Sequence, residues 1–229
     1  MDKVPAGLPA SKHFHIRKFD ATTKPMLLSE YAYLWPGATI AQSMKVLSEA
    51  MAFKALRLID TYRAVSHDRF VPWVALAAVD MRESGCDPMG CLANGDPWNK
   101  KTVHYPVGVG PWKSKADSMH WALDSFEKGW SVNLRKIKWT IPEILFFCEL
   151  WNGVLARMEP GTVPSDASPY LYSGAEFDGK PLYEKGKRKE RLGDDGRMRG
   201  YWDPAQVDLQ LGCMAFLKAL ESKGYNLTA

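Results

Sequence analysis

Apolar side chains recur at helical spacing through much of the chain. From Gln42 to His67 this spacing predicts one long amphipathic helix. A second helix should begin near Pro72, since proline is favoured in the first turn, and should run toward Glu83. The segment from Val71 to Met81 is apolar almost all round, so we expect this second helix to be buried.

Three further helices are predicted downstream, over residues 114–129, 140–153 and 203–224. The middle one has the strongest start signal, because Thr140 stands at the capping position and Glu143 follows three residues later. Asn and Gly at its far end favour a left-handed exit. The chain is therefore predicted to be mainly helical.

The segments between these helices have a different character. Residues 85–111 contain five Gly and four Pro, with a short apolar piece at 103–107, which predicts a hairpin or an irregular β-loop. Residues 153–202 are long and irregular. Within them, residues 176–199 carry eight basic and six acidic side chains, typical of a solvated loop, and a loop this long could cover a substrate groove.

These patterns predict a mainly α domain of the α+β class, with a small β-hairpin region inserted after the second helix. We expect the domain to span residues 41–225 and to include a long loop at 173–202. Residues 1–40 are rich in Pro, Lys and aromatic side chains and show no sustained period. We interpret them as an N-terminal arm that wraps the domain.

Composition narrows the classes of function. At 229 residues and 46% hydrophobic, the chain can bury a full core. Its net charge of +4, from 30 basic and 26 acidic residues, is too balanced to indicate nucleic-acid binding. The longest apolar run is far shorter than the roughly 20 residues that cross a bilayer, so we expect no stable membrane insertion. Nine Trp residues suit a hydrophobic core and could also stack on sugar rings.

No metal or cofactor site is expected. The cysteines Cys86 and Cys91 are close together, but no second pair or histidine pair completes a zinc site. They could form a disulfide outside a cytoplasm. Cys148 and Cys213 lie on apolar helix faces, where reduced core thiols are the better interpretation. The sequence has no P-loop, dinucleotide fingerprint or Ser-His-Asp set.

Two carboxylates and a hydroxyl form the candidate chemistry. Glu83 ends the apolar helix, Asp96 follows thirteen residues later inside an Asn-Gly-Asp-Pro turn, and Thr102 comes six residues after that. An acid against an apolar wall has a raised pKa and can protonate a leaving oxygen. A second carboxylate brought near it by a hairpin could hold a water molecule, as cleavage of a glycosidic bond requires.

Each of these residues also has a simpler interpretation. Glu83 could be an exposed helix-end residue paired with Arg82 or Arg69, and Asp96 could serve only its turn. His104 could bind substrate or transfer a proton, although one histidine in such a loop is more often structural. The combination of residues, in this order, favours catalysis.

Seven motifs in order support this view: R-E-S, N-G-D-P, T-V-H-x-P, W-T-I-P-x-I-L, E-x-x-N-G, S-P-Y-L and V-D-x-Q-x-G-C. They lie at residues 82–84, 94–97, 102–106, 139–145, 149–153, 168–171 and 207–213. On these motifs the chain resembles the lysozyme superfamily, in particular phage endolysins and related bacterial muramidases. The resemblance covers residues 45 to 220, and the gap between the Glu and the Asp is longer than in phage-type lysozymes.

The resemblance implies roles for individual residues. Glu83 would be the general acid, and Asp96 would orient or activate water with help from Thr102. Asn152, Tyr170 and Tyr172 would line the saccharide groove, and His104 remains the candidate for substrate binding that its place in the loop suggests. The family often has His three positions before the Glu, where this chain has Asp80. If Asp80 also faced the cleft, it would raise the pKa of Glu83 further.

The expected function is an endolysin-like N-acetylmuramidase that cuts the β-1,4 bond between N-acetylmuramic acid and N-acetylglucosamine. A lytic transglycosylase, a chitinase or chitosanase, and a non-catalytic wall-binding or virion protein remain alternatives. We expect a monomer whose partner is the glycan strand of peptidoglycan. Since no apolar signal segment is seen at the start, delivery to the wall should depend on a holin pore, a phage particle or a secretion apparatus.

Overall fold

The computed structural model describes residues 20–153, 168–185, 187–192, 198–203 and 205–228. The helices are α1 Thr23–Leu34, α2 Lys45–Leu56, α3 Ile59–Arg69, α4 Trp73–Ser84, α5 Lys115–Trp130, α6 Ile141–Trp151, α7 Pro169–Tyr172 and α8 Cys213–Ser222. The strands are β1 Ala38–Ile40, β2 Ala175–Phe177, β3 Lys180–Pro181, β4 Lys187–Leu192 and β5 Met198–Asp203. The protein is mainly helical, as predicted.

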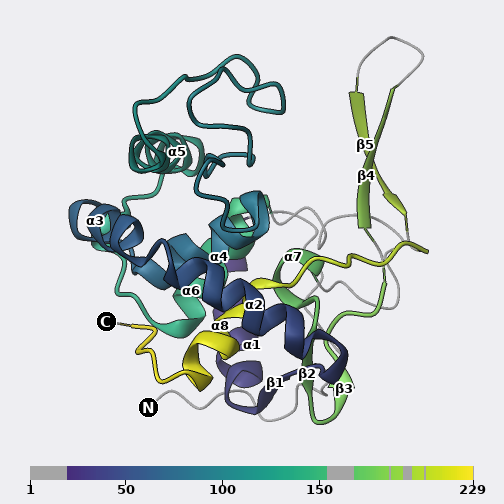
Figure 1. Ribbon diagram of the computed structural model, residues 1–229. Helices are drawn as coiled ribbons and strands as arrows, with labels where there is room; N and C mark the ends of the chain where they lie inside the picture. Colours follow the sequence, from purple (N-terminus) through teal and green to yellow (C-terminus); the bar gives the residue numbers. More distant parts are fainter. Residues whose placement is uncertain (1–19, 154–167, 186, 193–197, 204, 229) are drawn as a thin grey trace.

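Helix α4 lies at the centre of the molecule (Figure 1). It packs against α2, α3, α6 and α8, and all its side chains from Trp73 to Arg82 are buried. This confirms the prediction of a buried helix, which follows from side chains that are apolar on every face. The helix ends at Gly85, whose φ of 63° is easily adopted without a Cβ, and the chain turns there into the loop 85–114.

Helices α5 and α6 begin as their start signals predict. The Ser114 side chain accepts a hydrogen bond from the Asp117 N–H at 3.1 Å, and the Thr140 hydroxyl accepts one from the Glu143 N–H at 3.4 Å. Both bonds satisfy an N–H that has no partner inside its own helix. After α6, Gly153 has a φ of 82°, the predicted left-handed exit.

The single long helix predicted over residues 42–67 is wrong. The chain forms α2 and α3, separated by a turn at Arg57 and Leu58. The two helices have different neighbours, because α2 packs on α8 while α3 packs on α4 and α5. Helical spacing of apolar residues continues across the turn, so it could not reveal this change of direction.

The prediction of an N-terminal arm over residues 1–40 is wrong for the part of that segment that the structure describes. Residues 1–19 lie outside the described part, but residues 23–40 form α1 and β1. Leu27 and Tyr31 of α1 are fully buried, and α1 packs on α6. Other apolar side chains of α1, including Met26 and Tyr33, are partly buried against the core. The helix therefore lacks the alternation of an apolar and a polar face by which a helix is predicted from sequence.

Of the two alternatives predicted for the region directly after α4, the irregular loop is formed and the β-hairpin is not. The loop 85–114 contains turns and one isolated bridge, between Gly90 and Pro97. Four prolines interrupt any ladder because they lack an N–H. The small antiparallel sheet is built elsewhere, in the order β1-β2-β3, with Thr39 opposite Glu176.

The region predicted as a long loop, residues 173–202, contains β2 to β5. Strands β4 and β5 pair antiparallel, with Lys189 opposite Tyr201, and form a hairpin that projects away from the helices (Figure 1). The last helix begins at Cys213 and not near Asp203, which ends β5. The segment 205–212 is instead non-helical, and its backbone at Gly212 packs tightly on Leu171.

Candidate active site

Glu83 lies in the last turn of α4, where the buried helix meets the loop 85–114. Glu83 is half-buried, and the Tyr170 hydroxyl of α7 donates a hydrogen bond to its Oε1 at 2.8 Å. Burial raises the pKa of Glu83 to about 7, although the Tyr170 hydrogen bond and the Arg82 charge oppose this. The carboxyl group can therefore hold a proton near neutral pH, as a general acid must.

Tyr170 is itself held from below by Arg82. The Arg82 guanidinium lies 4.7 Å from the centre of the Tyr170 ring, a cation–π contact. Arg82 also donates to the Asp208 carboxylate at 2.8 Å and to the Leu211 carbonyl at 3.2 Å, and both charged side chains are buried. These contacts bring α7 and the segment 205–212 to Glu83.

The loop 85–114 is packed directly on the end of α4. A Cβ at Gly95 would lie 2.3 Å from the Glu83 carbonyl oxygen, and one at Gly90 would lie 2.5 Å from the Ser84 Cβ. Gly95 also has a φ of 77°. Glycine in the Asn-Gly-Asp-Pro turn is therefore required by close contact as well as by turn geometry.

A buried ion pair fixes this loop from beneath. The Lys115 ammonium donates to the Asp80 carboxylate at 2.8 Å and to the carbonyls of Asp87 and Gly90 at 2.8 and 2.6 Å. Asp80 also accepts from the Tyr62 hydroxyl at 2.6 Å. Asp80 is thus in the core and not in a cleft, and its charge makes only the smallest of the contributions that raise the pKa of Glu83.

Asp96 directly follows Gly95, which packs on the Glu83 backbone, but its carboxylate is already occupied. One oxygen accepts from the N–H groups of Val103 and His104 at 2.8 and 2.9 Å, and the other contacts His104 Nδ1 at 2.7 Å. Burial would raise the pKa of Asp96, but these hydrogen bonds outweigh it and hold the pKa below its usual value. Asp96 is ionised at neutral pH and serves the loop.

Thr102 is similarly committed. Its buried hydroxyl donates to the Pro106 carbonyl at 2.5 Å and accepts from the Val109 N–H at 3.1 Å. A hydroxyl has one proton to donate, so Thr102 cannot also donate to a water molecule in this arrangement. Thr102 lies in the predicted loop, but its hydroxyl stabilises the loop backbone and does not contact Glu83 or Asp96.

The predicted substrate-binding residues divide into two groups. His104 and Asn152 are exposed, whereas Tyr170 is buried and its hydroxyl contacts the Glu83 carboxyl. The prediction for Tyr172 is wrong, because its side chain is fully buried and donates to Glu30 at 2.5 Å. Residues two apart on a helical turn point to different faces, so Tyr170 and Tyr172 cannot both face the same groove.

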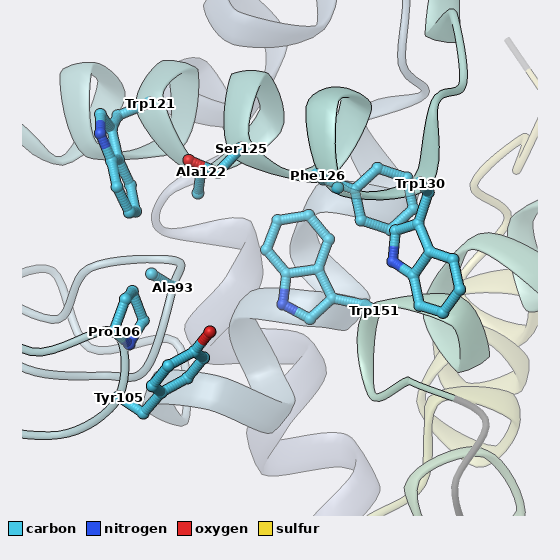
Figure 2. A pocket seen from close by; sticks show the side chains of 10 residues that line it. Ala93, Tyr105, Pro106, Trp121, Ala122, Ser125, Phe126, Trp130 and Trp151 are labelled. Atoms are coloured by element: carbon cyan, nitrogen blue, oxygen red, sulfur yellow. The ribbon is translucent and has the colours of Figure 1, made fainter.

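A cavity of about 580 Å³ lies between the loop 85–114, α5 and the end of α6. Figure 2 shows Trp121 of α5 and Tyr105 of the loop facing each other near one end of it, with Trp151 and Trp130 toward the other end. No sequence motif predicts this cavity, although nine Trp residues in one chain are a signal for an aromatic surface. Phe126 and Trp130 of α5 are four residues apart, a spacing that puts both on one helical face and could have suggested an aromatic wall.

The cavity adjoins the turn that packs on Glu83. Ala93, which lines the cavity, is two residues before Gly95. Aromatic faces suit the C–H faces of pyranose rings, while indole N–H groups and the exposed Tyr105 hydroxyl can bond to sugar hydroxyls. The same loop therefore lines the aromatic cavity and packs on the helix end that carries the proton donor.

The four cysteines Cys86, Cys91, Cys148 and Cys213 are free and buried, so Cys86 and Cys91 are not joined. Within the described ranges, no group of three or more His, Cys, Asp or Glu side chains could hold a metal ion. No described helix is long and apolar enough to span a bilayer. No family model, curated protein or solved structure matches the chain.

Replacing Tyr170 with Phe should raise the pKa of Glu83, because the lost hydrogen bond stabilises the carboxylate. If Glu83 acts as an acid, activity falls as pH rises through its pKa. The alkaline limb of the kcat/KM profile should therefore move to higher pH in Tyr170→Phe. Tyr225→Phe, which removes a hydroxyl from a ring packed on Trp73, should leave the profile unchanged. A shift to lower pH would contradict this assignment.

Proposed function

We propose that the protein is a peptidoglycan-cleaving glycosidase that cuts the β-1,4 bond between N-acetylmuramic acid and N-acetylglucosamine. The observation that carries this proposal is the Glu83 carboxyl, which is held at a helix end by Tyr170 and has a pKa of about 7. The ordered motifs around Glu83 that resemble muramidases give the substrate class.

In the proposed reaction the Glu83 proton passes to the glycosidic oxygen as the C1–O bond breaks. Positive charge then develops at C1 and the ring oxygen of the sugar. A water molecule adds to C1 and releases a proton, so the glycan strand is cut and a reducing end is formed. Glu83 is left as a carboxylate, which the Tyr170 hydroxyl stabilises until the carboxyl is protonated again.

A lytic transglycosylase is the second candidate, and one observation favours it. The Asp96 carboxylate and the Thr102 hydroxyl are both engaged in hydrogen bonds inside their loop. An enzyme that uses one acid and forms an anhydro sugar needs no pair of side chains to hold water. This candidate keeps Glu83 as the acid and differs only in what attacks C1.

Product analysis on purified peptidoglycan tests the proposal. Hydrolysis should give new reducing ends at N-acetylmuramic acid, detectable by borohydride reduction and mass spectrometry. Anhydro-muramic products, which are lighter than the hydrolysis products by one water, would establish the second candidate. Peptidoglycan that stays uncut at enzyme concentrations that saturate its surface would contradict both.

Tyr105→Ala should weaken substrate binding without unfolding the protein. The side chain is 88% exposed and lines the aromatic cavity, so its loss removes a contact surface but little core. We expect the KM for soluble glycan oligomers to rise about ten-fold, equivalent to roughly 1.4 kcal/mol, with a smaller change in kcat. Val103→Ala, an exposed residue of the same loop, is the matched control. An unchanged KM in Tyr105→Ala would exclude the cavity from the binding surface.

A further inference from the structure

Asp96 and His104 form an oriented pair that has no role in the reaction described above. The Asp96 side chain is 8% exposed, whereas that of His104 is 74% exposed, and 2.7 Å separates Oδ1 from Nδ1. An ionised carboxylate can only accept, so Nδ1 carries the proton in this contact. In the neutral imidazole the other ring nitrogen, Nε2, then has a free lone pair, as a general base requires.

The loop is built to hold this imidazole in place. The N–H groups of Val103 and His104 both donate to Asp96, so the same carboxylate fixes the backbone and the ring. Asn94 adds two hydrogen bonds, from Nδ2 to the carbonyls of His104 at 3.0 Å and Tyr105 at 3.3 Å. A base that is oriented by a third group is typical of catalytic arrangements.

The position of the pair relates it to the proposed site. Asn94 and Asp96 flank Gly95, which contacts the backbone of Glu83. On the other side of His104 in sequence, Tyr105 and Pro106 line the aromatic cavity. The imidazole therefore belongs to the stretch of loop that connects the proton donor with the aromatic surface.

We propose that His104 is the general base of the glycosidase and that Asp96 is its positioning residue; this inference rests on the proposed function. Glu83 gives its proton to the leaving oxygen and the C1–O bond breaks. The oxygen of a water molecule bonds to C1, and its proton passes to His104 Nε2. The resulting imidazolium is stabilised by the Asp96 carboxylate at Nδ1. Proton exchange with solvent returns His104 and Glu83 to their starting forms.

His104→Asn is the variant that separates base chemistry from loop structure. The Asn amide can donate to Asp96 in place of Nδ1–H, and the backbone N–H bonds to Asp96 remain, but no nitrogen base is left. Hydrolysis of purified glycan strands should fall about 100-fold or more. Azide needs no deprotonation to attack C1, so adding it should restore cleavage at least about ten-fold and give a glycosyl azide, identified by mass spectrometry.

Glu83→Gln is measured in parallel. Azide should not restore it, because the leaving oxygen still lacks its proton. If His104→Asn hydrolyses as the wild type does, or if it is inactive and azide gives no glycosyl azide, His104 is not the base. If the wild type forms only anhydro products, Glu83 remains the proposed acid and His104 is not the base. If the wild type does not cut the strands, both proposals fall.

Discussion

Glu83→Gln should lower cleavage of peptidoglycan by about three orders of magnitude, since it removes the acidic proton while keeping the size of the side chain. Gln can still accept the hydrogen bond that Tyr170 donates at 2.8 Å, so the contact between α4 and α7 should persist. Clearing of purified cell walls and the release of reducing ends both measure the effect. Glu49→Gln, on the exposed side of α2, should cleave as the wild type does.

The same variant should change how stability depends on pH. The pKa of Glu83 is about 7 in the folded protein and about 4.3 in an unfolded chain, so the folded state binds this proton more tightly. Its contribution to stability is present below the unfolded pKa and is lost as pH rises through about 7. Glu83→Gln should therefore gain thermal stability relative to the wild type at pH 8 compared with pH 4.

Together these two measurements identify the residue as an acid and not merely as a structural contact. We expect Glu83→Gln to be folded, to lose cleavage and to be more stable than the wild type at high pH. Equal wall clearing by wild type and Glu83→Gln would remove Glu83 from the reaction. Unfolding of Glu83→Gln would instead show that the site depends on the ionisable group for its structure.

Lys115→Met should cause the largest loss of stability. Lys115 is 6% exposed and Asp80 is fully buried, so removing the ammonium leaves a buried carboxylate without its counter-charge. Breaking such a pair costs about 3–5 kcal/mol. Two carbonyls of the loop 85–114, those of Asp87 and Gly90, also lose the hydrogen bond from Lys115, and Asp87 keeps only the one from the Gly90 N–H. Urea unfolding followed by circular dichroism measures the free energy of unfolding.

Two further variants test the cause of that loss. Lys113→Met, at an exposed position two residues earlier, should change the unfolding free energy by no more than about 0.5 kcal/mol. Adding Asp80→Asn to Lys115→Met should recover part of the stability, because the unpaired charge is then absent. If Lys115→Met alone is as stable as Lys113→Met, the ion pair does not hold the loop on α4.

The chemistry of the site could be predicted only as far as residue identity and order allow. Glu83 was recognised because it ends an apolar run, and that run does form a buried helix. Tyr170 was predicted to line the substrate groove on the basis of the resemblance, and the structure places it on the Glu83 carboxyl. Tyr172 came from the same reasoning and is buried on Glu30, since the direction of a side chain depends on its exact place in α7.

What the sequence determined by itself is the central helix, its terminal acid and the loop that must follow it. An apolar segment of helical length that stops at a glycine leaves few alternatives, because burial and backbone freedom are local properties. The start signals of α5 and α6 are local in the same sense, as each needs only a side chain and an N–H three residues away.

The tertiary structure alone decided what each polar group of the loop contacts. Asp96 could hold water or its own loop, and three hydrogen bonds from Val103 and His104 decide between them. Lys115 reaches Asp80 across 35 positions of sequence, and Arg82 reaches Asp208 across 126. Such pairings depend on where the folded backbone passes, so the spacing of residues along the chain does not contain them.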